Sequence, residues 1–213
     1  MKIHLENIGR RFNREWIFKK VNYQFETGGS YAILGANGSG KSTLLQIIAG
    51  SLSPSEGRIT YYDGQKCIDA ENIYQYLGLS TPYLELIEEF SLSELADFHF
   101  SFKSYLRGID KKMLTDLLGF EKIRNKPIRH YSSGMKQRVK LALTICSDTP
   151  IILLDEPTAN LDKQGVDWYL NLISRFGSGR LLIVCSNQEH EYQFCDHRLQ
   201  LMDYKDFSSV KDN

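Results

Sequence analysis

The sequence predicts an α/β fold with a mostly parallel sheet, an N-terminal antiparallel β-layer and an inserted helical subdomain. Short, largely apolar runs at residues 31–34, 151–154 and 181–185 are typical of strands covered on both faces, as in a parallel sheet. Apolar and polar residues alternate before residue 30, which favours an antiparallel layer. From about residue 81 to residue 130 the apolar spacing becomes helical, which indicates the insertion.

Each element follows from a local pattern along the chain. Alternating residues predict two N-terminal strands around residues 3–8 and 21–25, and Asp63-Gly64 predicts a hairpin turn after the run at 58–62. Helical spacing predicts helices over residues 93–102, 112–118, 135–147 and 166–176. We interpret the chain as a single domain of residues 1–213, with a core of 1–80 and 131–213 and a helical subdomain of about 81–130.

Composition excludes some classes of partner and indicates where the protein is located. It has 213 residues, with 26 Lys plus Arg against 26 Asp plus Glu, so the formal net charge is zero. This balance carries no electrostatic signature of nucleic-acid binding, and no nucleic-acid partner is expected. The four cysteines lack metal-type spacing, and the N-terminal residues lack the apolar core of a signal peptide. No apolar run approaches the roughly 20 residues of a membrane span, so we expect a cytoplasmic protein that reaches the membrane only through a partner.

Residues 35–42 carry the most informative motif, because they fit the phosphate-loop pattern G-x-x-x-x-G-K-[ST] between a predicted strand and a predicted helix. Glycines let the loop fold closely around phosphates, and the helix N-terminus adds its positive dipole end. Lys41 can reach the β- and γ-phosphates, and Ser42 can offer a hydroxyl to Mg²⁺. The predicted nucleotide contacts are Gly35, Ala36, Asn37, Gly38, Ser39, Gly40, Lys41, Ser42 and Thr43.

Two carboxylates close the buried run at 151–154 and form the second chemical signal. Asp155 stands at the carboxyl end of the predicted strand, where ligands bind in open α/β sheets. We expect Asp155 to hold Mg²⁺ with Ser42, and Glu156 to polarise the attacking water as the catalytic residue. Asp-Glu-Pro is also an ordinary surface turn, but the upstream phosphate loop favours the functional interpretation.

The segment Tyr131-Ser-Ser-Gly-Met135 precedes a predicted helix, and Ser132 or Ser133 suits its N-cap. With the phosphate loop before it and Asp155-Glu156 after it, this segment resembles the signature of ATP-binding-cassette (ABC) ATPases, where L-S-G-G-Q is usual. Asn160-Leu-Asp162 looks like the family's D-loop, and Phe12 stands where an adenine-stacking aromatic is found. The resemblance extends from Met1 to about residue 200.

The resemblance implies ATP as the nucleotide and a head-to-tail dimer with an identical or related cassette. In such a dimer Ser132, Ser133 and Gly134 would contact the ATP held by the other subunit. It also implies a nucleotide-binding subunit of a bacterial transporter, which drives a separate transmembrane permease and lies on the inner face of the membrane through it.

Two positions depart from the family pattern. Instead of a Gln at the junction of core and helical subdomain, the chain has Leu79-Ser80-Thr81-Pro82, and Gln75 lies too early, in a predicted strand. Ser80 or Thr81 is a candidate for part of the role. Asn187 replaces the usual switch His; its amide can donate to phosphate but cannot shuttle a proton. His190 is expected to be an exposed helix residue, and ATP hydrolysis is expected to be slow.

The sequence is compatible with other functions. A soluble, non-transport cassette ATPase, for example of the iron–sulfur assembly type, is the main alternative to a transporter subunit. The single short cassette resembles small bacterial export systems, including the haem-exporter group. A GTPase or small-molecule kinase is disfavoured because no N-K-x-D motif occurs. The transported substrate, the direction of transport and the identity of the second cassette stay open.

Overall fold

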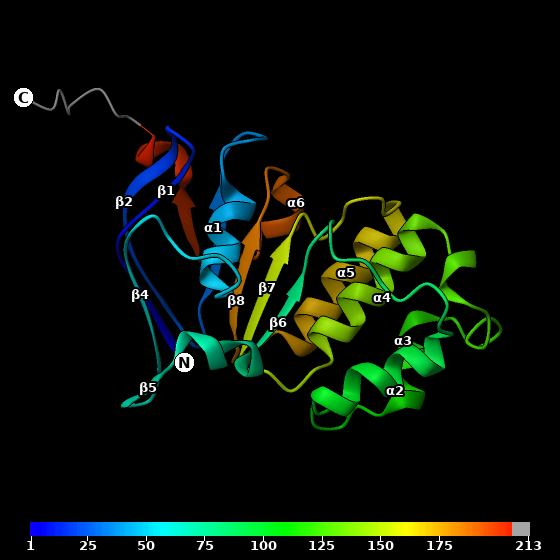
Figure 1. The fold of residues 1–213 in the computed structure, drawn as a ribbon. Coiled ribbons are helices and arrows are strands. Elements are labelled where there is room, and N and C mark those ends of the chain that lie inside the picture. Colours follow the sequence, from blue (N-terminus) through cyan, green and yellow to red (C-terminus); the bar gives the residue numbers. More distant parts are fainter. Residues whose placement is uncertain (206–213) are drawn as a thin grey trace, which may run out of the picture.

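A five-stranded parallel sheet forms the centre of the computed structural model, which describes residues 1–205 (Figure 1). Its strand order is β6-β7-β8-β3-β9, and every neighbouring pair is parallel. The carboxyl ends of all five strands therefore meet at one edge. The strands are β3 (Ser30–Leu34), β6 (Leu77–Ser80), β7 (Ile151–Asp155), β8 (Leu181–Cys185) and β9 (His197–Gln200).

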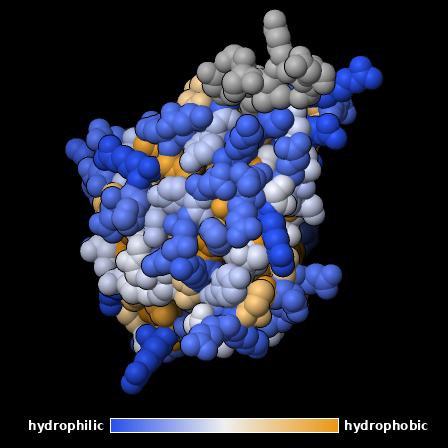
Figure 2. All heavy atoms as spheres, turned by 90° about the vertical axis from the view of Figure 1, so that its left-hand side faces the viewer, coloured by the Kyte–Doolittle hydropathy of each residue, from blue (hydrophilic) through white to orange (hydrophobic). Residues whose placement is uncertain are grey.

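A second, antiparallel sheet has the order β2-β1-β4-β5, which confirms the predicted N-terminal β-layer. Its strands are β1 (Lys2–Phe12), β2 (Glu15–Glu26), β4 (Glu56–Asp63) and β5 (Lys66–Ile68). Helix α1 (Lys41–Ile48) lies between the two sheets, because its buried side chains share one core cluster with those of β1 and β7. Polar side chains cover most of the face that the antiparallel layer turns to solvent (Figure 2).

Two long helices cover the other face of the parallel sheet. Side chains of α4 (Ser133–Ile145) and α5 (Lys163–Phe176) pack in one cluster with Ile152 and Leu154 of β7. Outside α4 lie α2 (Leu92–Phe102) and α3 (Lys111–Leu118), which share a third cluster with α4 (Figure 1). Both fall inside the predicted helical subdomain, whose limits stay a prediction.

Helix α4 begins two residues before the predicted start. Ser132 is its N-cap, and the Ser132 hydroxyl accepts the Met135 N–H at 3.2 Å. This bond satisfies one of the free N–H groups of the first turn. Of the two serines predicted as the N-cap, Ser132 therefore has that position.

Short helical turns connect the remaining elements: η1 (Ala70–Tyr76), η2 (Ile128–His130), α6 (Glu189–Tyr192) and η3 (Leu201–Tyr204). The prediction that Gln75 lies in a strand is wrong, because Gln75 belongs to η1. Ile73 is the buried side chain of this segment, and Asn72 N–H donates to Asp69 O at 2.9 Å. Hydrogen bonds within this turn thus take the place of the bonds to a neighbouring strand that the prediction required. Among the described residues, no helix is both long and apolar enough to cross a bilayer.

Candidate nucleotide-binding site

The phosphate loop joins the carboxyl end of β3 to α1. Gly38 and Gly40 have φ angles of 72° and 101°, a region that L side chains rarely adopt. A Cβ on Gly40 would lie 2.3 Å from Ile17 Cγ2, so no larger residue fits unless the Ile17 side chain moves. Steric room and backbone conformation both explain the glycines of the motif.

The N-terminus of α1 presents backbone donors that no side chain caps. Gly40 occupies the N-cap position and makes no side-chain bond, while Leu44 N–H donates back to Gly40 O at 2.9 Å. The first N–H groups of any α-helix lack intrahelical acceptors. Together with the helix dipole, such free donors favour the binding of an anion.

Lys41 lies over the loop and is only 5 % exposed. Its Nζ donates to Gly35 O at 2.9 Å and to Ala36 O at 3.3 Å. Within the described residues no carboxylate forms an ion pair with it. The ammonium group is therefore held in place by neutral carbonyls and keeps its charge available for a phosphate.

A hollow of about 430 Å³ opens beside this loop. The Phe12 ring is not among the groups that line it; Phe12 is 51 % exposed, with the Arg10 guanidinium 4.7 Å from its centroid. Ile17 and Tyr83 line the hollow, although the sequence pattern did not single them out. The lining residues are Ile17, Asn37, Gly38, Ser39, Gly40, Lys41, Ser42, Thr43, Tyr83 and Glu156.

Asp155 has the environment of a magnesium ligand. Its Oδ1 is buried and has no hydrogen-bond partner among the described residues. Burial raises the pKa of Asp155, an effect that the Ser42 hydroxyl opposes and Glu156 reinforces. Carboxylate and hydroxyl oxygens suit Mg²⁺, which usually takes few protein ligands and completes its shell with phosphate and water. The described residues contain no group of three or more His, Cys, Asp and Glu placed for a metal.

Glu156 follows β7 in a backbone conformation that is rare for its residue type. Its φ is 43°, and its N–H donates to Cys185 O of β8 at 2.9 Å. The left-handed conformation turns the half-buried side chain toward the hollow that Lys41 and Ser42 line. Such local strain persists where surrounding structure holds it and is frequent at functional sites.

The segment Ser132–Gly134 lies apart from this hollow. Ser132 and Ser133 are exposed at the start of α4, and none of the three residues lines the hollow. Gly134 packs closely on the Asn160 backbone, because a Cβ on it would lie 2.8 Å from Asn160 O. The structure therefore does not unite the two predicted phosphate-contacting segments within one chain.

Asn187 contacts the phosphate loop through its side chain, since its Nδ2 donates to Asn37 Oδ1 at 2.8 Å. His190 lies in α6 as predicted, but the expectation that it is exposed is wrong: it is half-buried, with Nε2 3.0 Å from Thr158 Oγ1. The tight turn of α6 against Thr158 accounts for this. Ser80 pairs with Leu154, so its side chain faces α4 and α5, opposite to Asp155.

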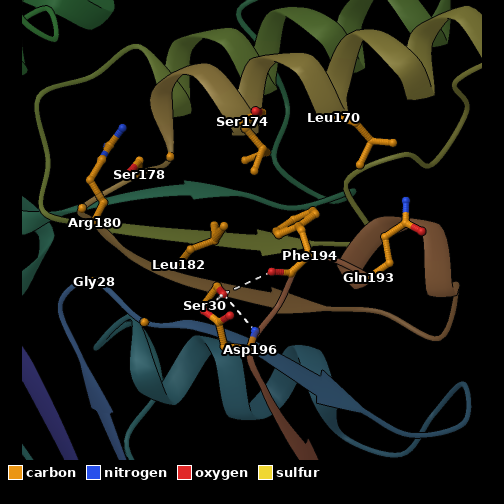
Figure 3. Close-up of a pocket in the computed structure, with 14 residues that line it drawn as sticks. Gly28, Ser30, Leu170, Ser174, Ser178, Arg180, Leu182, Gln193, Phe194 and Asp196 are labelled. Carbon is orange, nitrogen blue, oxygen red and sulfur yellow. Dashed lines mark hydrogen bonds between the residues drawn. The ribbon is translucent and has the colours of Figure 1, made fainter.

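A second hollow, of about 420 Å³, opens at the other edge of the sheet (Figure 3). Its charged groups already have partners. Arg180 donates to Ile145 O at 2.7 Å and Ser147 O at 2.9 Å, and Asp196 Oδ2 accepts the Ser30 hydroxyl at 2.7 Å. Among the described residues that line this space, no cation is without a partner and none begins a helix.

A phosphate loop at the carboxyl edge of a parallel sheet, followed by Asp-Glu at the end of β7, defines a P-loop nucleotide-binding protein. The family described as ABC transporter matches residues 18–159, about two thirds of the chain. The chain belongs to this family, and it is an ATP-binding and ATP-hydrolysing cassette.

Individual relatives cover most of the chain. It is 32% identical over 203 residues to the energy-coupling factor transporter ATP-binding protein EcfA1 of Thermotoga maritima, covering 92% of this chain and 75% of the relative. It is 30% identical to the cytochrome c biogenesis ATP-binding export protein CcmA of Agrobacterium fabrum, covering 88% and 90%. Among solved structures, cbiO1 from Clostridium perfringens is 27% identical, with a TM-score of 0.72 and coverage of 93% and 83%. A dimeric cassette bound to ADP and Pi, MJ0796, shares the fold with a TM-score of 0.78 at 24% identity, covering 93% of both chains.

Proposed function

We propose that this cassette binds Mg²⁺-ATP at the phosphate loop and works as a head-to-tail dimer that drives a separate transmembrane partner. The observation that carries the proposal is the position of Ser132–Gly134, which lies outside the hollow beside the phosphate loop with both serines exposed. These residues offer backbone donors and a helix dipole but no metal ligand and no lysine. A γ-phosphate bound to a second cassette would supply what they lack.

The polar residues in and beside the hollow have separate roles in this proposal. Backbone N–H groups of residues 38–43 and the Lys41 ammonium hold the phosphates, while Ser42 and Asp155 hold Mg²⁺. Bound Mg²⁺ neutralises charge on the phosphates. Glu156 orients the attacking water, and Asn187 contacts the γ-phosphate. An Asn amide cannot take up a proton, which supports a slow turnover.

A groove of about 270 Å³ between the core and the helical segment supports docking of a transmembrane partner. Its rim carries large apolar side chains that remain in contact with solvent, including Phe102, which is 75 % exposed. Exposed apolar groups of this kind mark protein interaction sites. The relatives named for transport, export and energy coupling favour a transporter subunit at the inner face of a membrane over the soluble iron–sulfur alternative.

Dimer formation is tested with Glu156→Gln, which removes the water-orienting carboxylate and keeps the ATP site. We expect steady-state hydrolysis to fall about 100-fold or more, and light scattering to show a dimer with Mg²⁺-ATP and a monomer without it. Adding Ser132→Arg to Glu156→Gln should abolish the dimer. Adding Ser178→Arg, at an exposed serine of the opposite sheet edge, should preserve it. A wild-type rate in Glu156→Gln, or a dimer that tolerates Ser132→Arg, contradicts the proposal.

Partner docking is tested separately with Phe102→Glu. This variant should lose co-purification with a membrane-spanning protein from detergent extracts and keep ATP-dependent dimerisation. Met202→Glu, at another exposed apolar side chain that lies outside the groove, is the control. Unchanged co-purification in Phe102→Glu would remove the groove from the proposal.

A further inference from the structure

Glu191 is a charged side chain with no exposed surface, placed in the four-residue helix α6. Its Oε1 accepts the Thr158 N–H at 2.8 Å and also the Thr158 hydroxyl, and its Oε2 accepts the Ser186 hydroxyl. Within residues 1–205 no Lys, Arg or His forms an ion pair with it. Three neutral donors therefore surround one buried carboxylate.

Such a group is an unfavourable choice for packing alone. A carboxylate buried without a cation loses its hydration, and an apolar side chain of similar volume would fill the space at no such cost. The helix that carries it is anchored independently, since the buried Tyr169 hydroxyl donates to Glu191 O at 3.0 Å. What distinguishes Glu191 is the pair of segments that its two oxygens join.

Both segments lead directly to the nucleotide site. Thr158 is two residues after Glu156, and Ser186 immediately precedes Asn187. Asn187 in turn donates to Asn37 of the phosphate loop at 2.8 Å. A continuous chain of bonds therefore runs from the segment after β7, through one carboxylate, to the segment after β8 and on to the loop.

The same segment is also tied to the helix that begins with Ser133. Gln137 of α4 is buried, and its Nε2 donates to Pro157 O at 2.9 Å. Pro157 lies between Glu156 and Thr158. A displacement of α4 would thus reach the residues beside Glu156 first, and Asn187 through the Glu191 bonds together with the backbone bond from Glu156 N–H to Cys185 O.

We propose that Glu191 is a positioning residue that holds Glu156 and Asn187 in register across the ATP γ-phosphate. This inference deepens the proposed function and rests on the roles assigned there to Glu156 and Asn187. Glu191 itself touches neither ATP nor water; it acts through Thr158 and Ser186. Loss of its bonds is expected to slow hydrolysis while leaving ATP binding at the phosphate loop intact.

The test compares Glu191→Gln with two control variants. Gln keeps one acceptor oxygen for the Thr158 N–H but presents an NH₂ group in place of the second. Glu189→Gln makes the same chemical change at an exposed position of the same helix. Ser147→Ala removes a buried hydroxyl, bonded to Leu143 O at 2.6 Å and to His99 at 2.9 Å, far from the nucleotide site. For each variant we would measure kcat, KM, ATP affinity by titration and the melting temperature.

We expect Glu191→Gln to lower kcat about tenfold, with ATP affinity within twofold of wild type and a melting shift no larger than that of Ser147→Ala. In an Asn187→Ala background the same change should lower kcat less than twofold, because both residues act through one segment. Full kcat in Glu191→Gln, multiplicative losses in the double variant, or an equal kcat loss in Ser147→Ala would overturn the proposal.

Should Glu191→Gln fail to fold, Thr158→Val and Ser186→Ala each remove one arm of the same contact and are judged by the same criteria. A separate experiment shows whether the proposed function itself is wrong. If Glu156→Gln hydrolyses ATP at the wild-type rate, the assigned role of Glu156 is wrong whatever Glu191→Gln shows.

Discussion

Two helix N-termini, those of α1 and α4, are proposed to bind the phosphates of ATP, and they are built differently. Helix α1 begins at a glycine with φ of 101° and no side-chain cap, beside a buried lysine. Helix α4 has Ser132 as its N-cap, whose hydroxyl already accepts one backbone N–H, and the cation of its first turn is the half-buried Lys136, which pairs with Glu88 at 2.5 Å. The first end lies in a hollow of its own chain and the second end is exposed.

This difference supports the proposal that the α1 end is a complete anion site and the α4 end is half of one. Uncapped donors, a dipole and a lysine can bind phosphate without help. A capped and solvated helix end has weaker attraction for an anion, because water and the cap already satisfy its donors. Variants of the two ends should therefore fail in different assays.

The largest effect is expected for Lys41→Ala. Loss of a charge-assisted hydrogen bond to phosphate costs about 3 kcal/mol, or roughly a 100-fold loss of ATP affinity. Lys140→Ala is the matched control, because Lys140 is also a buried lysine held by backbone carbonyls, Thr81 O at 3.0 Å and Pro82 O at 3.3 Å. Equilibrium titration of the monomer with ATP measures both. Equal affinities for Lys41→Ala and wild type would show that α1 does not need its lysine.

Gly40→Ala tests whether the shape of the α1 end is required. The added Cβ would lie 2.3 Å from Ile17 Cγ2 at a backbone φ of 101°, so strain and overlap together should destabilise the fold by about 2–3 kcal/mol. Gly38→Ala has positive φ but nothing within 4 Å, and should cost only about 1 kcal/mol. Urea unfolding compares the two. Similar losses in both variants would mean that the contact with β2 is not tight.

We expect the free energy of unfolding to depend on pH through His99 of α2. The His99 Nε2 is 2.9 Å from the hydroxyl of Ser147, which lies just beyond the C-terminus of α4. Burial, reinforced by the Lys103 charge, lowers the pKa of His99 to about 4. The unfolded chain therefore binds the proton more readily, so stability is complete above about pH 6.5 and falls as the pH drops toward 4. After allowance for partial exposure we expect a loss of about 1–2 kcal/mol between pH 7.5 and pH 5.

The His99→Gln variant isolates this contribution, because it keeps a polar contact with Ser147 and cannot titrate near pH 6. Its unfolding free energy should change less over the same pH interval than that of wild type. His130→Gln, at an exposed position, serves as the control and should retain the wild-type dependence. An unchanged pH slope in His99→Gln would assign the acid sensitivity to other groups.

Local chemistry explains which parts of the molecule could be predicted from the sequence. The strands β3, β7 and β8 are short apolar runs, and the phosphate loop needs glycine at defined positions, so both leave a signal in adjacent residues. The sequence likewise predicts one of two adjacent serines as the N-cap of α4. These features depend on contacts within a few residues along the chain.

Features that depend on distant contacts left no such signal. Ile17 reaches the hollow because β2 packs beside the phosphate loop, and Tyr83 because the chain turns back after β6. His190 is half-buried because α6 packs on Thr158, and Glu191 carries no motif. A buried charge among polar neighbours in sequence cannot be recognised before the fold brings its partners together. The roles of Phe12 and of the other site residues stay predictions.

The smallest effect is expected for Ser132→Ala, which tests most directly how the α4 end differs from the α1 end. Removing the cap of α4 should cost about 1 kcal/mol of stability. Ser91→Ala is the matched control, because Ser91 caps α2 by accepting the Glu94 N–H at 3.3 Å and lies outside the predicted signature. Both variants should melt a few degrees lower and bind ATP as monomers with wild-type affinity. Only Ser132→Ala should also weaken ATP-dependent dimerisation and lower the steady-state hydrolysis rate, because only its helix end would meet the γ-phosphate of a second cassette. Equal rates in the two variants at equal stability would show that the α4 end serves its own fold and nothing beyond it.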